Sequence, residues 1–209
     1  MAEFRTAGIV LHRQNFKDAD RICRIFTREF GFISVIAKGC KKMKSKKSGT
    51  LELFSESNFR LHRRTGELFL VVDALKYSHF SADLPALKVA YSTAEWLLAL
   101  APAERPFPQI YEITRAFLKI LPRTSKLQLI EIAWRTKIIA QLGFFPDSAE
   151  FDMRMNKFFK FLLTSDFSEI IRLIDDYAVF TAAEKILIQI FETTTEKTSR
   201  VTATTADWV

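Results

Sequence analysis

The sequence has few of the residues that build catalytic and metal sites. It contains two cysteines, three histidines and six glycines in 209 residues. Cys23 and Cys40 belong to neither a CxxC pair nor a Cys/His cluster, so no zinc site is predicted. Walker, GxSxG and Gly-rich dinucleotide motifs are also missing from the sequence. These absences favour a binding protein over an enzyme, with no catalytic residue, no metal ligand and no cofactor.

Long apolar runs and a secretory signal are missing as well. No stretch approaches the roughly 18 apolar residues that a membrane-spanning helix needs. Residues 1–14 carry charges on both sides of a very short apolar run, which is not the pattern of a signal peptide. Two cysteines without such a signal indicate a reducing compartment. We therefore expect a cytoplasmic location.

Positive charge is abundant and unevenly spread. The chain has a formal net charge of +7, with 31 Lys and Arg against 24 Asp and Glu. Residues 1–80 hold 16 of the basic and 8 of the acidic residues, whereas the rest of the chain holds 15 basic and 16 acidic residues. The excess therefore belongs to the first 80 residues, and it predicts an anion-binding surface there.

The most basic segment is a lysine-rich stretch, residues 38–49. It holds six lysines and no acid, and it lies between an apolar run at 32–37 and an alternating run at 51–62. This composition predicts a loop between two strands. Two interpretations are open from the stretch alone: a solvated loop whose lysines avoid the core, or a phosphate-binding loop.

The first 80 residues have the pattern of a small β-barrel. Apolar and polar residues alternate, which is the period of a strand, and glycine-containing turns separate the runs. We expect five strands, at Thr6–Arg13, Arg21–Thr27, Phe32–Lys38, Leu51–His62 and Leu68–Tyr77. Five strands with short connections and one longer loop are typical of an OB-fold barrel. Residues 1–80 are therefore predicted to form an OB-fold domain, and this domain contains the predicted anion-binding surface.

Helical periodicity replaces alternation after residue 80. We expect helices at 84–100, 108–121, 124–142, 148–163, 168–177 and 181–191, with Asp83, Ser148, Ser168 and Thr181 as N-caps. Residues 81–195 should form an all-α bundle, and residues 196–209 a loosely ordered tail. The predicted fold class is α+β: an N-terminal five-stranded OB barrel followed by a helical bundle.

A basic groove along an OB barrel can hold single-stranded nucleic acid through its phosphates. The candidate DNA-binding residues are the basic ones on the predicted strands, turns and lysine-rich loop: Arg13, Lys17, Arg21, Arg24, Arg28, Lys38, Lys41, Lys42, Lys44, Lys46, Lys47, Arg60, Arg63 and Arg64. Phe16, Phe54 and Phe69 are candidates for base stacking, although a phenylalanine in such a position is more often a core residue. Because lysine contacts to phosphates carry no direct sequence information, little base specificity is expected.

Short motifs occur in a fixed order over residues 5–147. They are Ala7-Gly8-Ile9-Val10-Leu11, Asp18-Ala19-Asp20-Arg21-Ile22, Phe26-Thr27-Arg28-Glu29-Phe30-Gly31, Ala37-Lys38-Gly39, Ser45 and Gly66-Glu67-Leu68, followed by Ala90-Tyr91 and Leu142-Gly143-Phe144-Phe145-Pro146. In order and spacing they resemble the RecO family of bacterial DNA repair and recombination proteins.

The resemblance implies an OB fold, a helical domain and a non-enzymatic role. Family members are recombination mediators that bind single- and double-stranded DNA, anneal complementary strands and, together with RecR, help RecA displace single-strand-binding protein. It would place Lys38 and the lysine-rich loop on the DNA-binding surface, and it implies association with the nucleoid. The acidic C-terminal tail of single-strand-binding protein could then meet basic helix positions: Lys88, Arg115, Lys119, Arg135 and Lys137. Solvated helix faces are the alternative explanation for those five.

The sequence departs from the family at one place. Many members carry a four-cysteine zinc module just after the Gly-aromatic-Pro segment, whereas residues 147–152 of this chain contain no cysteine. The zinc module is therefore expected to be absent. Two other functions remain open: a protein adaptor whose basic surface binds an acidic partner, and an RNA-binding OB-fold protein.

Overall fold

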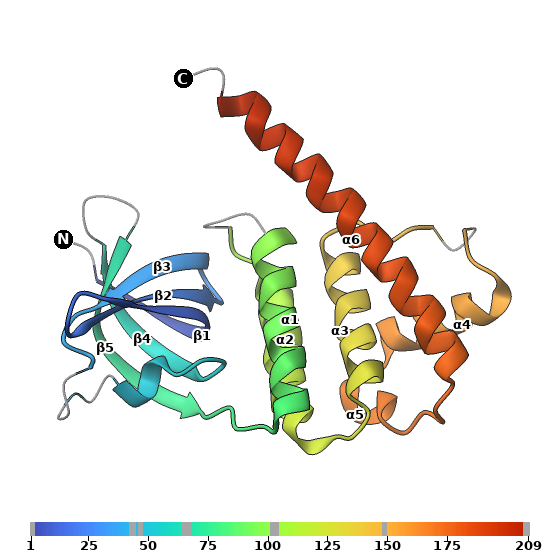
Figure 1. Cartoon of the computed structure of the whole chain (residues 1–209), viewed down its shortest axis with the longest axis horizontal. Coiled ribbons are helices and arrows are strands. Elements are labelled where there is room, and N and C mark those ends of the chain that lie inside the picture. The colour runs from blue at the N-terminus through green and yellow to red at the C-terminus, as the bar shows by residue number, and fades with distance from the viewer. Residues whose placement is uncertain are drawn as a thin grey trace.

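A computed structural model describes residues 3–41, 45, 48–63, 68–100, 105–147 and 150–206. A β-barrel from the first part of the chain lies beside a group of helices from the rest (Figure 1). This arrangement confirms the predicted α+β class.

Five strands form the barrel. They are β1 (Glu3–Phe16), β2 (Asp20–Thr27), β3 (Gly31–Ala37), β4 (Glu56–Arg63) and β5 (Leu68–Ser78), and a 3-10 helix, η1 (Ser48–Leu51), precedes β4. The sheet closes in the order β1-β2-β3-β5-β4, and only the β3–β5 pair is parallel. A closed five-stranded barrel in this order agrees with the OB fold expected from the sequence.

Strand β1 closes the barrel because it pairs along both of its edges. Residues 3–9 pair with β4, and residues 8–16 pair with β2 across a register shift between Val10 and His12. Alternation along the strands turns every second side chain inward. The interior is apolar and holds Val10, Cys23, Ile25, Ile33, Val35, Phe59, Leu61 and Val71, all at most 2% exposed.

The expected strand Leu51–His62 is wrong in its first half, because β4 begins only at Glu56. Leu51 belongs to the barrel core, whereas Phe54 belongs to the core that faces the helices. The chain must therefore turn between these two residues. Phe54 has a φ of 60°, and its N–H donates to the Val10 carbonyl at 2.7 Å. The alternation of apolar and polar residues alone does not show that Leu51 and Phe54 pack into two different cores.

Helices make up the rest of the chain. They are α1 (Leu84–Leu100), α2 (Pro108–Ile120), the 3-10 turn η2 (Leu121–Arg123), α3 (Leu127–Gln141), α4 (Met153–Thr164), α5 (Phe167–Ile170) and α6 (Tyr177–Ala206). Helix α3 lies at the centre and contacts α1, α2, α4, α5 and α6. Its Trp134 is fully buried and packs against Phe117 of α2.

Aspartates, rather than the expected serine and threonine, cap the last three helices. Asp152, Asp166 and Asp176 each accept a hydrogen bond from the backbone N–H three residues ahead. The expected helix 168–177 is consequently the single turn α5, and Asp176 starts a helix where an end was expected. Asp83 caps α1 as predicted, since it accepts from the Ala86 N–H at 3.0 Å. Ser148 lies outside the described residues.

Helix α6 continues to Ala206, through the range that we expected to be a loose tail. Thr193, Thr194 and Thr195 donate their hydroxyl hydrogens to carbonyls four residues earlier. Threonine can make this bond inside a helix, so a threonine-rich segment is compatible with helical structure. The last turns of α6 extend past the other helices (Figure 1).

The core that faces the helices contains residues of the barrel as well as of the helices. Phe26 and Phe32, on the outer face of β2 and β3, stack at 4.4 Å, and Phe26 meets Tyr111 of α2 at 5.6 Å. The turn before β3 also approaches the helical part: a Cβ on Gly31 would lie 2.0 Å from the Arg105 carbonyl oxygen.

Replacing Gly31 with alanine should therefore lower the free energy of unfolding by about 2 to 3 kcal/mol. Its φ of 68° costs a non-glycine residue about 1–2 kcal/mol, and the Arg105 backbone must also shift. Thermal or urea unfolding measures the loss. Gly143→Ala is the matched control, because Gly143 has a φ of 80° with nothing within 4 Å of the added Cβ. It should cost only about 1 kcal/mol, and equal losses in both variants would contradict the predicted contact.

Candidate nucleic-acid interface

The two turns at one end of the barrel bring together a group of exposed residues that we call the lysine end: Phe16, Lys17, Lys38 and Lys41. Lys17 lies in the β1–β2 turn, and the two other lysines follow β3. The turns are joined by the N–H groups of Gly39 and Lys41, which donate to the Asp20 carboxylate at 2.8 Å and to the Ala19 carbonyl at 3.0 Å. Within the described ranges, none of the three ammonium groups has an acidic partner.

Two predicted arginines lie behind the lysine end and share one carboxylate. Arg13 donates to Glu52, and Arg21 lies 3.6 Å from the other oxygen of the same group. Both side chains are partly buried, and Glu52 offsets part of their charge. These two arginines are therefore better placed to stabilise the position of the lysine end than to bind a phosphate directly.

The remaining predicted arginines do not join this group. Arg24 lies on the outer face of β2, between His12 and Ser34 of the neighbouring strands. The others pair elsewhere: Arg28 with Glu112 at 3.3 Å, Arg60 with Glu3 at 3.8 Å, and Arg63 over the Phe69 ring at 5.5 Å. The candidate DNA-binding residues within the described ranges therefore do not form one group on the surface of the barrel. Lys42, Lys44, Lys46, Lys47 and Arg64 lie outside the described residues.

Only one of the three candidate stacking residues is available on the surface. Phe16 is 37% exposed, with the Lys17 ammonium 5.5 Å from its ring centroid. Phe54 and Phe69 are 3% and 4% exposed, so both are core residues and neither is available to stack on a base. Phe54 packs against Phe80 and Tyr91, and Phe69 closes the barrel core beside Phe4.

The five basic helix positions differ in exposure. Lys88 and Lys119 are exposed, whereas Arg135 is 7% exposed and is unsuited to bind a partner. Arg135 donates to Glu131 and Ser92, and it lies 4.5 Å from the Trp96 ring. The fourth position, Lys137, donates to the Ser165 carbonyl at 2.8 Å, and burial lowers its pKa. Helical periodicity alone does not distinguish these surroundings.

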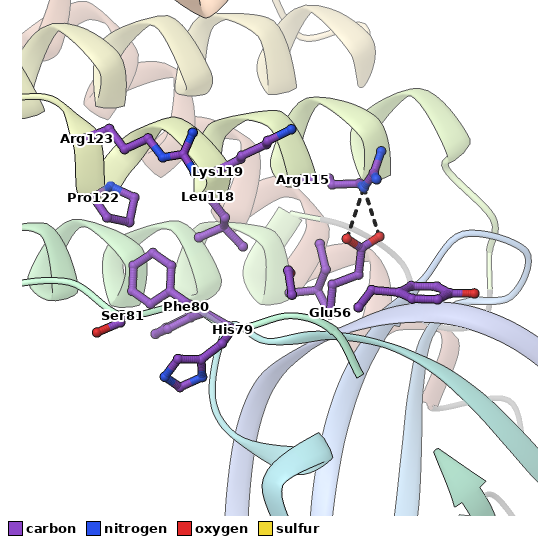
Figure 2. A pocket seen from close by; sticks show the side chains of 13 residues that line it. Glu56, His79, Phe80, Ser81, Arg115, Leu118, Lys119, Pro122 and Arg123 are labelled. Carbon is purple, nitrogen blue, oxygen red and sulfur yellow. Dashed lines mark hydrogen bonds and ion pairs between the residues drawn. The ribbon is translucent and has the colours of Figure 1, made fainter. Parts of the chain in front are cut away.

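Arg115, the fifth position, belongs to a contact between the barrel and α2 that the sequence did not predict. Glu56 of β4 is 8% exposed and accepts a hydrogen bond from the Tyr111 hydroxyl at 3.0 Å. The Glu56 carboxylate also contacts the Arg115 guanidinium, at 2.9 and 3.0 Å (Figure 2). Burial, and then the Glu56 charge, raise the pKa of Tyr111. Glu56 lies on the polar face of its strand, and its partners are 55 and 59 residues away, so no local pattern signals the contact.

Both cysteines are buried, free thiols near the lysine end. Burial, with a smaller contribution from Cys40, raises the pKa of Cys23 from 9.0 to about 11. Burial also raises the pKa of Cys40. Since the thiolate is the nucleophile, neither group is activated for chemistry in the folded protein.

Stability should therefore decrease as the pH rises above about 9. The unfolded chain releases the Cys23 proton near 9.0, whereas the folded chain keeps it to about 11. In that interval the unfolded state binds fewer protons, so about 2 kcal/mol of unfolding free energy is lost by pH 11. Urea unfolding between pH 8 and 11 measures this loss. Cys23→Ala should show a shallower decrease, and identical pH profiles would contradict the prediction.

The described part of the chain holds no group of three or more His, Cys, Asp or Glu residues placed to bind a metal ion. None of its helices combines the length and apolar character needed to cross a bilayer.

Comparisons with known proteins point to one family. Residues 1–76 match the family described as Recombination protein O N terminal. Curated proteins named DNA repair protein RecO are similar over a longer range. The one from Prosthecochloris aestuarii is 30% identical over 148 residues, 68% of this chain and 56% of its own length. The one from Listeria welshimeri is 29% identical over 141 residues, which are 66% of this chain and 55% of its own length. This chain thus spans about half the length of the curated relatives that it matches.

Proposed function

We propose that this chain, which belongs to the RecO family of DNA repair proteins, is a non-enzymatic mediator of DNA recombination that binds DNA through its barrel. It would bind single- and double-stranded DNA and bring complementary strands together by offsetting their phosphate charge. The observation that carries the proposal is the lysine end, where Lys17, Lys38 and Lys41 lie exposed on two joined turns.

The charges of the barrel support this proposal. The four arginines at positions 13, 21, 28 and 60 form ion pairs with carboxylates, whereas the three lysines form none in the described part of the chain. An unpaired, exposed ammonium can exchange its counterions for phosphates without first breaking an ion pair. Phe16 adds an exposed ring beside Lys17 for stacking with a base.

The proposed partners follow from the family. We propose that the chain works with RecR to help RecA displace single-strand-binding protein, at the nucleoid. Lys88 and Lys119 are the exposed helix positions available to the acidic tail of single-strand-binding protein, and Arg115 becomes available only if it leaves Glu56.

Fluorescence anisotropy with a labelled single-stranded oligonucleotide over a salt series tests DNA binding. The logarithm of the association constant should decrease linearly with the logarithm of the salt concentration. A fluorescence-energy-transfer assay with complementary strands then tests annealing, and RecA filament formation on DNA coated with single-strand-binding protein tests mediation. An absence of binding at low salt would contradict the proposal and favour a protein adaptor. Stronger competition by RNA of the same sequence would favour RNA as the target.

A further inference from the structure

A cavity of about 400 Å³ lies between the barrel and α2, away from the lysine end. Ile9 and Phe54 come from the barrel side, the end of β5 and the segment after it contribute residues 77–81, and α2 with η2 forms the opposite wall. Figure 2 shows the Phe80 ring on the side of its segment that faces Pro122 and Arg123, whereas the His79 side chain points the other way. The volume lies within the range of small-ligand sites.

The helical wall is cationic. Arg115, Lys119 and Arg123 follow one another at intervals of four residues, so they lie in one row along α2 and η2. Arg115 is held by Glu56, but Lys119 and Arg123 have no hydrogen-bond or ion-pair partner anywhere in the described ranges. Two exposed side chains with unpaired positive charges therefore form part of the cavity lining.

The opposite wall offers an aromatic surface. Phe80 is half-buried and packs edge-on against Phe54 at 5.4 Å, and His79 beside it is exposed. Ser78 and Ser81 add hydroxyl groups to the lining. A ligand that fits this cavity has a negative charge for one wall and a flat ring for the other.

We propose that this cavity binds one nucleotide of a single DNA strand, with its phosphate on Lys119 and Arg123 and its base against Phe80. This inference rests on the proposed function, because it needs a single strand bound to the barrel. The strand would pass from the lysine end to the helices, and the cavity would hold one of its bases out of the stack. An acidic peptide would meet the same two cations, but it would leave the aromatic wall without a partner.

The test uses the full chain and a labelled oligothymidylate that carries one 2-aminopurine base. Lys119→Ala with Arg123→Ala should weaken binding about 10- to 30-fold at 0.1 M salt, as expected for the loss of two phosphate contacts. Phe80→Leu should weaken it about fivefold and remove the quenching of 2-aminopurine that stacking causes. Lys157→Ala with Lys160→Ala is the matched control, since both are exposed lysines of α4. It should change affinity less than twofold.

The outcomes separate this site from the proposed function. A wild-type chain that does not bind the oligonucleotide overturns both. Normal wild-type binding that is unchanged in the Lys119/Arg123 and Phe80 variants overturns the cavity site alone. Displacement of the oligonucleotide by an equal concentration of oligoglutamate also overturns it, in favour of an acidic protein partner.

Discussion

Replacing Glu56 with alanine is expected to lower the free energy of unfolding by about 3 to 4 kcal/mol. The buried Tyr111 hydroxyl loses its acceptor, which costs about 1–3 kcal/mol, and the charge-assisted bond to Arg115 is lost as well. Because the Arg115 side chain is 54% exposed, water compensates part of the second loss. The expected decrease in melting temperature is roughly 6–16 °C, measurable by calorimetry or circular dichroism.

Glu112→Ala is the matched control for this variant. Glu112 also pairs with Arg115, at 3.4 Å, and with Arg28 at 3.3 Å, but its side chain is 45% exposed. Exposed pairs contribute about 0–1 kcal/mol, so this variant should lose little stability. Equal losses in the two variants would show that burial of Glu56 between the barrel and α2 has no special role.

Replacing Lys17, Lys38 and Lys41 together with alanine is expected to weaken single-stranded DNA binding on the order of 100-fold at 0.1 M salt. Each phosphate contact contributes about 0.7 to the slope of log affinity against log salt, so three lysines contribute about 2. If the variant and the wild type converge near 1 M salt, a slope difference of 2 becomes a 100-fold difference at 0.1 M. A salt series by fluorescence anisotropy measures both quantities.

A variant with the same loss of charge elsewhere separates a local effect from a global one. Lys157, Lys160 and Lys185 are exposed on α4 and α6. Their replacement by alanine also removes three positive charges, but it should leave the slope nearly unchanged. Equal slopes for the two triple variants would mean that the net charge of the protein, and not the lysine end, determines binding.

Local patterns in the sequence predict the presence of strands and helices better than the residues at which they begin and end. The alternation in residues 1–80 predicts five strands because a barrel wall has one apolar face. The alternation does not predict the turn at Phe54, because this turn depends on whether the Phe54 ring packs in the barrel interior or in the core that faces the helices. Likewise, Asp152, Asp166 and Asp176 begin the last three helices because a carboxylate accepts an N–H bond as well as a serine hydroxyl does.

The sequence predicts the positive charge of the candidate site but not the arrangement of its side chains. Composition locates the positive charge in the first 80 residues, and the turns indicate that Lys17 and Lys38 are exposed. The pairing of Arg13 and Arg21 with Glu52 joins residues about 30 to 40 positions apart, so no sequence window contains it. The same holds for the cavity beside Lys119, which exists only because β5 and α2 meet.

Photo-crosslinking measures most directly where DNA lies on this protein. An oligothymidylate bound to the full chain is irradiated, and the cross-linked peptides are identified by mass spectrometry. DNA binding by the barrel predicts cross-links in peptides that contain Phe16 or residues 38–41, and their loss when Lys17, Lys38 and Lys41 are replaced. Cross-links confined to α3, α4 and α6, unchanged in that variant, would contradict it.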